Sequence, residues 1–156
     1  ATPMVDPSSD LDFVEDAAEL RLGPEFDDAQ CMFLNEVASF LDLKAKDKLS
    51  ASSESRANTM AASVIAKTKA YCERFQAVNS MLEKQVGCNI LRKQLQRPLD
   101  SGTNIGRGLK SFQVASLVNL QPDNAEEAKA IIPSLADFDD DDVEHFLRVA
   151  RESQGQ

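Results

Sequence analysis

Apolar side chains recur every three or four residues through most of this chain, which is the spacing of helices that bury one face. Two long patterns come first. One predicts a helix that begins at Asp28, capped by Asp27 or Asp28, and the other predicts a helix over 58–78. A serine-rich stretch near 49–58 predicts a hinge between them. The stripe positions of the two helices are Phe33, Val37, Phe40, Leu41, Leu43, Met60, Val64, Ile65, Thr68, Tyr71, Cys72 and Phe75.

Two further helices are predicted in the middle of the chain. Ser80 and Glu83 have the spacing of a capping box for a third helix, and Pro98 closes that helix. Ser111 is expected to cap a fourth helix that ends before Pro122. The apolar positions of the two are Leu82, Val86, Ile90, Leu91, Phe112, Ala115, Val118 and Leu120.

Two shorter helices complete the pattern. Asn124 and Glu127 form a second capping box, and Pro133 ends this helix after Ile132. Aspartates at 139–142 fill the first turn of a last helix, where the helix dipole favours negative charge, and we expect them to be solvated. The stripe of the last helix is Val143, Phe146, Leu147 and Ala150.

The segment before the first helix has a different period. Residues 19–22 alternate polar and apolar side chains, as a strand does, and Gly23-Pro24 stops the alternation. Since no other strand is predicted, this segment is expected to be an extended arm or short strand that pairs with the sheet edge of a partner. An extended lead-in packed on the helices is the alternative that the residues leave open.

These patterns predict an all-α fold, a helical bundle preceded by an extended N-terminal arm, and no βαβ rhythm is present. The expected organisation is a disordered acidic tail at 1–14, an arm at 15–27, N-terminal helices at 28–97, a loop insertion at 98–110 and C-terminal helices at 111–152.

Charge narrows the classes of partner. The 156 residues carry a formal net charge of −9. Affinity for nucleic acid comes largely from Lys and Arg that neutralise phosphates, so the isolated chain should bind nucleic acid poorly and a protein partner is expected. No apolar run approaches the roughly 20 residues needed to cross a bilayer. The first ten residues lack the basic and apolar regions of a secretory signal.

No pattern supports catalysis or a cofactor. Cys31, Cys72 and Cys88 are widely spaced and form no CxxC pair, so reduced, buried thiols are expected rather than a zinc site. The glycines before Lys110 have the wrong register for a P-loop, and the aspartate run lacks the glycine and the final glutamate of an EF-hand. His145 is the only histidine and is expected to be exposed. We therefore expect no cofactor, no metal and no catalytic residue.

One segment of this acidic chain is locally basic. Residues 91–110 contain five basic side chains against Asp100 alone, and these are Arg92, Lys93, Arg97, Arg107 and Lys110. Such a face could meet RNA or an acidic protein surface, and a solvated loop is the alternative.

Four segments, in order along the chain, resemble the RNA polymerase II stalk subunit four family. They are Glu15–Phe26, in which Leu-Gly-Pro-Glu-Phe is the most characteristic part, Leu34–Val37, Leu109–Leu120 and Ala125–Leu135. The loop at 98–108 and the hinge near 50–58 depart from the family pattern.

The resemblance implies a helical protein whose carboxyl-terminal half is similar to the HRDC domain of helicases. It also implies a nuclear, non-catalytic subunit that forms a heterodimer with polymerase subunit seven. That pair projects as a stalk near the RNA exit channel, contacts the polymerase core including its largest subunit, supports initiation and meets RNA through the partner. The residues expected to bind the partner are Leu20, Leu22, Gly23, Pro24, Phe26, Leu34, Glu36 and Val37.

The sequence is also compatible with three alternative functions. The polymerase III counterpart shares the fold and the partner logic. A stand-alone HRDC-type nucleic-acid-binding module would bind nucleic acid with a strong dependence on salt. A helical enzyme is the weakest alternative, because no metal, cofactor or nucleophile constellation is present.

Overall fold

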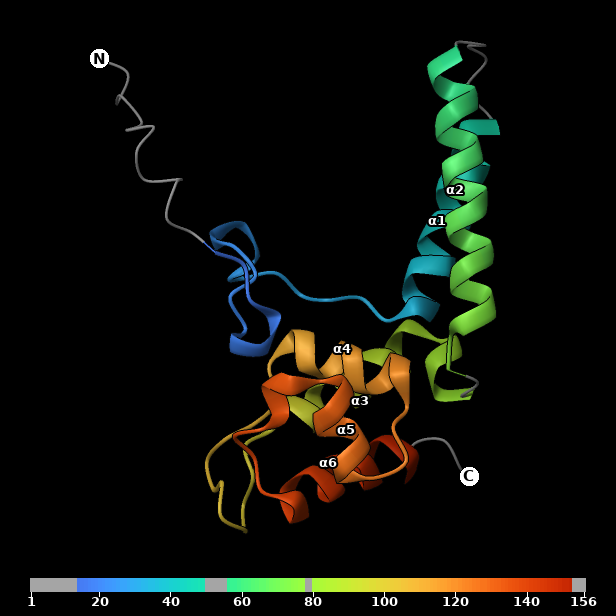
Figure 1. The fold of residues 1–156 in the computed structure, drawn as a ribbon. Coiled ribbons are helices and arrows are strands. Elements are labelled where there is room, and N and C mark those ends of the chain that lie inside the picture. The colour runs from blue at the N-terminus through green and yellow to red at the C-terminus, as the bar shows by residue number, and fades with distance from the viewer. Residues whose placement is uncertain (1–13, 50–55, 78–79, 153–156) are drawn as a thin grey trace, which may run out of the picture.

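The computed structural model describes residues 14–49, 56–77 and 80–152. Over these residues the chain forms six α-helices and four 3-10 turns (Figure 1). The helices are α1 (Leu34–Leu49), α2 (Arg56–Phe75), α3 (Gln85–Gln96), α4 (Ser111–Leu120), α5 (Ala125–Ile131) and α6 (Asp140–Glu152). The turns are η1 (Ala17–Glu19), η2 (Pro24–Phe26), η3 (Ser80–Glu83) and η4 (Pro133–Leu135). The predicted all-α fold class is confirmed.

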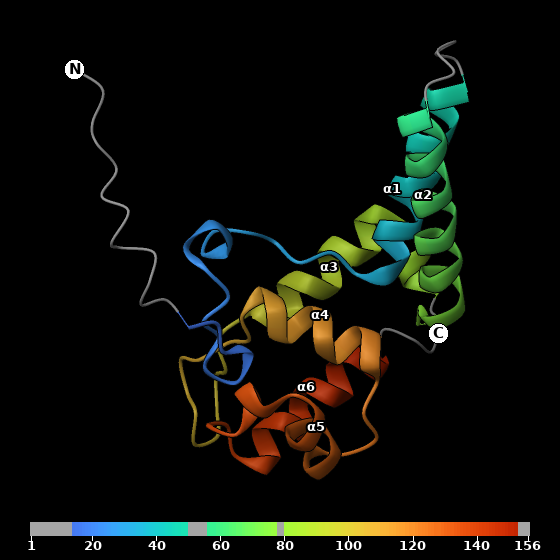
Figure 2. The same ribbon diagram turned by 45° about the horizontal axis from the view of Figure 1, so that its top comes forward.

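The helices form two regions. We call α1 and α2 the hairpin, because they stand side by side and project away from the rest of the chain (Figures 1 and 2). We call α3, α4, α5 and α6 the bundle, because they pack around a common core. The predicted division of the chain at 98–110 stays a prediction, but α3 shares the core of the helices that follow it.

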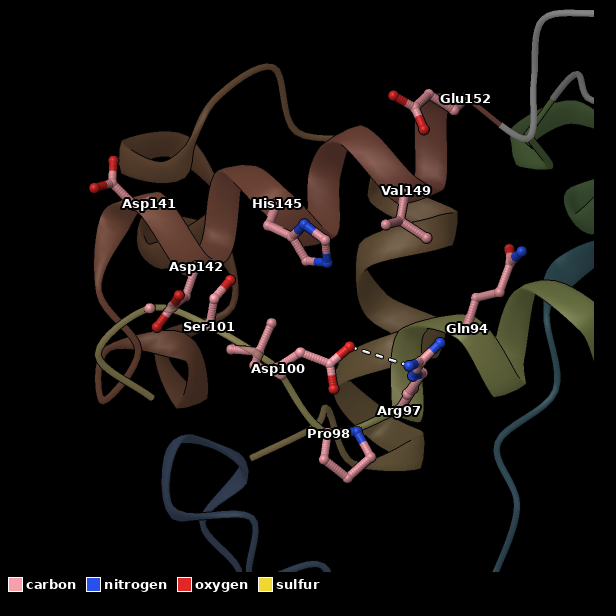
Figure 3. Close-up of a pocket in the computed structure, with 12 residues that line it drawn as sticks. Gln94, Arg97, Pro98, Asp100, Ser101, Asp141, Asp142, His145, Val149 and Glu152 are labelled. Carbon is pink, nitrogen blue, oxygen red and sulfur yellow. Dashed lines mark hydrogen bonds and ion pairs between the residues drawn. The ribbon is translucent and has the colours of Figure 1, made fainter. Parts of the chain in front are cut away.

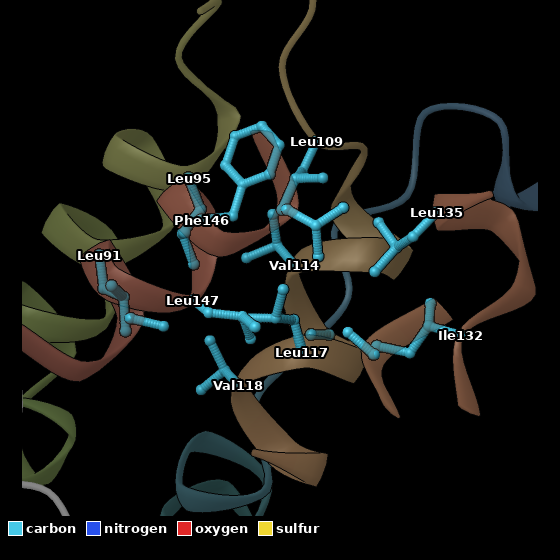
Figure 4. Packing of buried hydrophobic residues seen from close by; sticks show 14 of the residues in the cluster. Leu91, Leu95, Leu109, Val114, Leu117, Val118, Ile132, Leu135, Phe146 and Leu147 are labelled. Carbon is cyan, nitrogen blue, oxygen red and sulfur yellow. The ribbon is translucent and has the colours of Figure 1, made fainter. Parts of the chain in front are cut away.

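The bundle core is a continuous apolar cluster contributed by all four helices and the turn η4 (Figure 4). Its largest fully buried side chains are Phe33, Phe146, Leu91, Leu95, Leu117, Leu135, Leu147, Val114 and Val143. Phe33, which precedes α1, is the member that ties the base of the hairpin to this core. Burying each such side chain contributes about 1.5–3 kcal/mol.

The two predicted carboxyl-terminal helices are confirmed. Asn124 caps α5, since its side chain accepts a hydrogen bond from the Glu127 N–H at 2.9 Å. Glu127 reaches back one residue further than in a capping box and accepts from the Asp123 N–H. The whole predicted stripe of α6 is buried, namely Val143, Phe146, Leu147 and Ala150.

The prediction that α1 begins at Asp28 is wrong, because backbone N–H groups of the preceding segment bond to α4 instead. Cys31 donates its N–H to the Ser111 hydroxyl at 2.7 Å, and Leu34 donates to the Asn119 side chain at 3.0 Å. The prediction that Ser111 caps α4 is therefore wrong. Its hydroxyl instead accepts a hydrogen bond from the linker before α1. The Gln113 side chain satisfies the start of α4 by accepting from the Lys110 N–H at 2.9 Å.

The third predicted helix is divided into a 3-10 turn and an α-helix, and the α-helix buries a different face from the predicted one. Lys84 has extended backbone angles, φ −120° and ψ 139°, so the 3-10 turn η3 is separate from α3. Leu82 and Leu91 are buried as predicted, but Val86 and Ile90 are exposed. The face of α3 that packs into the bundle is instead formed by Gly87, Cys88, Leu91, Arg92 and Leu95.

The loop between α3 and α4 folds against the start of α6. Asp142, expected to be solvated, is buried and accepts a hydrogen bond from the Asn104 N–H at 3.0 Å. The Asn104 side chain in turn accepts from the Asp139 N–H at 2.9 Å. Gly108 lets the loop return close to α3, because a Cβ there would overlap the Gln96 carbonyl oxygen.

The predicted disordered tail lies outside the described residues, apart from Val14, and so does most of the serine-rich hinge. Along the described part of the chain, no helix combines the length and the apolar character that a membrane crossing requires.

Candidate partner-binding surface

The arm before α1 is a compact turn. The Asp16 carboxylate accepts a hydrogen bond from the Ala18 N–H at 2.9 Å. Asp16 and Arg21 exchange two backbone hydrogen bonds of 2.9 Å, and Leu20 adopts a left-handed conformation with φ 57°. The strand predicted at 19–22 is therefore wrong for the free chain, because a local cap closes the turn. Pairing of this arm with the sheet of a partner stays a prediction.

The arm borders an open apolar cleft. Leu20, Leu22 and Phe26 line one side, and Cys31 and Phe112 line the other, around a volume of about 520 Å³. Phe26 is largely exposed, while Leu20 and Leu22 are half-buried. The structure thus brings together three of the residues predicted to bind a partner, next to Phe112, an aromatic residue of α4.

Gly23 and Pro24 shape the arm. Gly23 is buried and has φ 107°, a conformation that favours glycine. Pro24 opens the turn η2, where its fixed φ suits the first position. These two residues set the direction in which Phe26 projects, so their contribution to the surface is through backbone geometry.

Glu36, another residue predicted to bind the partner, forms a buried ion pair within the chain. Its carboxylate lies 2.5 Å from the Arg92 guanidinium on α3, and the two side chains are 4% and 5% exposed. The same carboxylate accepts from the Phe33 N–H at 2.7 Å and from the Gln85 side chain at 2.5 Å. Arg92 also stacks over the Phe33 ring, at 4.5 Å from its centroid. With these donors in place, the carboxylate holds the hairpin on the bundle.

Leu34 and Val37 are half-buried in the first turn of α1. They flank the buried Glu36 and lie where the hairpin meets the bundle. Their predicted contact with a partner stays a prediction, at the lower edge of the hairpin.

The most exposed apolar surface lies on α2 and was missed, because its residues were expected to be buried. We call Met60, Val64, Tyr71 and Phe75 the α2 stripe. Each is between 49% and 68% exposed. Their spacing places them on one face, over a length of about 22 Å. Contiguous exposed apolar residues of this size mark interaction surfaces in proteins.

Aromatic contacts strengthen one end of the α2 stripe. The Tyr71 and Phe75 ring centroids lie 4.8 Å apart, and the Arg74 guanidinium lies 5.1 Å from the Phe75 centroid. On α1, Phe40 and Leu43 are also largely exposed. One feature of the sequence indicates this surface. Helix α2 carries apolar residues on two faces, since Ile65 and Cys72 lie beside the stripe. A hairpin of two helices can cover only one of these faces.

Charged residues hold the hairpin helices together. Asp42 of α1 bonds to Lys69 of α2 at 2.8 Å and to Lys46 at 2.9 Å. The Lys69 hydrogen bond, followed by that of Lys46, lowers the pKa of Asp42 to about 2. The same Asp42 contact raises the pKa of Lys69. The α2 face next to the stripe is therefore fixed against α1.

The predicted basic face is divided among several structural roles. Arg92 is buried in its ion pair, so it is not part of a surface. Arg97 pairs with Asp100 at 3.0 Å, and Arg107 stacks over Phe138 at 4.4 Å from the ring centroid. This division weakens the reading of one continuous RNA-binding face over 92–110.

Another cleft lies between α3, the loop and α6, with a volume of about 690 Å³ (Figure 3). His145, which is half-buried, points into it, and its Nδ1 lies 3.0 Å from the Arg148 guanidinium. Asp142 is occupied by the loop amide of Asn104. No serine or cysteine nucleophile pairs with His145 among the contacts of the described residues.

The three cysteines likewise give no indication of a reactive site. Cys72 and Cys88 are buried and Cys31 is half-buried, all with free thiols. Burial raises the pKa of the Cys72 and Cys88 thiols, so they stay protonated and unreactive. In the described ranges, no three His, Cys, Asp or Glu side chains group closely enough to hold a metal ion.

The family model RNA polymerase Rpb4 matches residues 31–153. The DNA-directed RNA polymerase II subunit 4 of Arabidopsis thaliana is 33% identical over 138 residues, covering 85% of this chain and 88% of that protein.

Two relatives are named DNA-directed RNA polymerase II subunit rpb4. The one from Schizosaccharomyces pombe is 29% identical over 136 residues, covering 86% of this chain and 88% of that protein. The one from Dictyostelium discoideum is 28% identical over 144 residues, covering 85% of this chain and 84% of that protein. The chain therefore belongs to the Rpb4 family of RNA polymerase II subunits.

Proposed function

We propose that this chain pairs with subunit seven of nuclear RNA polymerase II and forms with it the stalk near the RNA exit channel, which supports initiation. In this role the chain has no active site of its own and supplies a binding surface. The α2 stripe is the observation that carries the proposal, since four large apolar side chains on one helix face are left without cover in the free chain.

The proposed surface has two parts. The hairpin supplies the α2 stripe, and the arm supplies Leu20, Leu22 and Phe26 around their apolar cleft. Apolar side chains of the partner would fill both. The buried Glu36–Arg92 pair fixes the angle between the hairpin and the bundle, so Glu36 contributes by positioning the surface.

The test is co-expression of this chain with its subunit seven partner, followed by measurement of the heterodimer affinity. Tyr71→Ser combined with Phe75→Ser should weaken binding by at least about 30-fold, because aromatic residues are prominent among interface hot spots, which contribute about 2 kcal/mol or more. The matched control is Leu120→Ser with Ile131→Ser, two exposed apolar residues of the bundle. The control should change the affinity less than about threefold. Equal effects of the two double variants would refute the assignment of the surface.

The arm is tested separately. Leu20→Asp with Leu22→Asp should weaken the heterodimer if the arm lies against the partner, since two carboxylates would enter an apolar cleft. Val14→Asp, at an exposed position just before the arm, is the control. Unchanged affinity in the double variant would restrict the interface to the hairpin.

Isolation of the tagged chain from its own cells under gentle conditions tests the stalk assembly, because the large subunits that accompany the chain identify the polymerase. Polymerase II subunits would support the proposal, and polymerase III subunits would overturn it.

A further inference from the structure

Basic residues are concentrated in the middle of this acidic chain. Residues 56–110 contain ten basic and three acidic side chains, a net charge of +7 in a chain of −9. Helix α3 lies within this segment and contains no Asp or Glu. Its surface therefore differs in sign from most of the molecule.

The solvent face of α3 combines this charge with apolar side chains. We call Val86, Ile90, Lys93 and Arg97 the α3 stripe, because their spacing of four, three and four places them on one face, over about 16 Å. Val86 is 69% exposed, Ile90 is 42% exposed and the Arg97 side chain is 71% exposed. The stripe is apolar at its first half and basic at its second half.

Hollows lie on both sides of the stripe. Lys93 borders one of about 420 Å³, which the linker segment 28–30 also lines. Arg97 borders the cleft of Figure 3, together with Asp100 and Glu152. The two hollows therefore flank the basic half of the α3 stripe.

Nearby carboxylates do not neutralise the stripe. Asp28 also lines the smaller hollow, on the linker before α1, and no ion pair joins it to Lys93 among the described residues. Asp100 pairs with Arg97 at 3.0 Å, but both side chains are more than two-thirds exposed, and such a pair contributes little free energy. A carboxylate from another molecule can therefore replace Asp100 at Arg97 at small cost.

We propose that the α3 stripe docks an acidic, amphipathic helical segment of another protein, separately from the surface proposed for subunit seven. Two apolar side chains of that segment, four residues apart, would cover Val86 and Ile90, and carboxylates further along would pair with Lys93 and Arg97. RNA fits less well, because the exposed apolar members are aliphatic, and single-stranded nucleic acid stacks on aromatic rings.

The test uses the full chain, labelled with ¹⁵N, and two synthetic peptides of 15 residues. One carries leucines four residues apart and glutamates on the same helix face beyond them, and the other has the same composition in scrambled order. The ordered peptide should shift the amide signals of α3 and bind at least tenfold more tightly than the scrambled one. Raising the NaCl concentration from 50 to 300 mM should weaken it several-fold.

Two pairs of variants locate the site. Lys93→Glu with Arg97→Glu should weaken the ordered peptide at least tenfold, whereas Lys44→Glu with Lys67→Glu, an equal change of net charge on the hairpin, should change it less than twofold. The first variant should still pair with subunit seven, so failure here is distinguishable from failure of the stalk assignment.

Three results would overturn the proposal. One is equal binding of the ordered and scrambled peptides. Another is equal sensitivity to the two charge reversals. The third is tighter binding of a twelve-nucleotide single-stranded oligouridylate than of the ordered peptide, with loss in Lys93→Glu/Arg97→Glu, which would assign the stripe to nucleic acid.

Discussion

The hairpin and the bundle contain apolar stripes of similar spacing but bury them differently. In α6 the stripe residues Val143 and Phe146 are fully covered, because α3, α4 and α5 surround that helix. In α2 the stripe residues Tyr71 and Phe75 remain exposed, because α1 covers only the neighbouring face. The same sequence pattern therefore encodes a buried core in one region and an exposed apolar surface in the other.

This difference has a physical origin. A two-helix layer can bury only the faces that its helices turn toward each other, whereas four helices enclose a common interior. Apolar side chains beyond that capacity stay exposed unless another molecule covers them. The hairpin thus carries more apolar surface than its two helices can bury between them.

The sharpest way to break the comparison is to truncate one aromatic residue in each region. Phe146→Ala should lower the free energy of unfolding by about 3–5 kcal/mol, since it leaves a cavity in the bundle core. Phe75→Ala should lower it by only about 0.5 kcal/mol, since that ring is half exposed. Urea unfolding of the free chain measures both values. Equal losses would mean that the α2 stripe is covered within the chain.

The joint between the two regions should give the next largest effect. Arg92→Met leaves the buried Glu36 carboxylate without its charged partner and should cost about 3 kcal/mol. Arg97→Met removes an exposed pair and should cost less than about 0.5 kcal/mol. Urea unfolding compares them, and amide hydrogen exchange in α1 shows whether the hairpin is released.

A second variant keeps this prediction open to refutation. Glu36→Leu combined with Arg92→Met removes both charges and should recover much of the lost stability, because the desolvation cost disappears with the pair. If Arg92→Met alone proves harmless, the ion pair does not hold the hairpin on the bundle.

Local signals explain which helices could be predicted. The cap of α5 at Asn124 and the stripe of α6 lie within the helices that they define, and both were predicted. The start of α1 was not, because Cys31 and Leu34 bond to side chains 80 and 85 residues away on α4. Sequence patterns within a short segment indicate Asp28 as a possible helix cap, but they do not show that acceptors on α4 bind the same segment.

The candidate surface was predictable only in part. The arm residues were named through family resemblance, and the structure groups Leu20, Leu22 and Phe26 at one cleft. For the α2 stripe the sequence predicts burial and the structure shows exposure, because periodicity reveals an apolar face but not what covers it. Glu36 shows the reverse case: its role depends on Arg92, 56 residues away, which no local pattern indicates.

Caps should matter most for the shortest helix of the bundle. Asn124→Ala removes the side-chain acceptor of the Glu127 N–H and should cost about 1 kcal/mol. Glu126→Ala, at an exposed position in the same turn, should cost at most about 0.5 kcal/mol. Thermal unfolding of the two variants distinguishes them. Equal melting temperatures would show that packing alone holds α5.

The smallest effect concerns the hairpin and its dependence on pH. The pKa of Asp42 is about 2 in the folded chain against an ordinary value of 3.8, so folding favours the charged carboxylate. Its contribution is therefore complete above about pH 4 and is lost as the pH falls toward 2. Carbon-detected NMR titration of the Asp42 carboxyl measures the pKa directly. Lys69→Met should raise that pKa more than Lys46→Met does, because the Lys69 hydrogen bond is the larger cause. An Asp42 pKa near 3.8 in the unaltered chain, or equal effects of the two lysine variants, would show that this contact does not join α1 to α2 in solution.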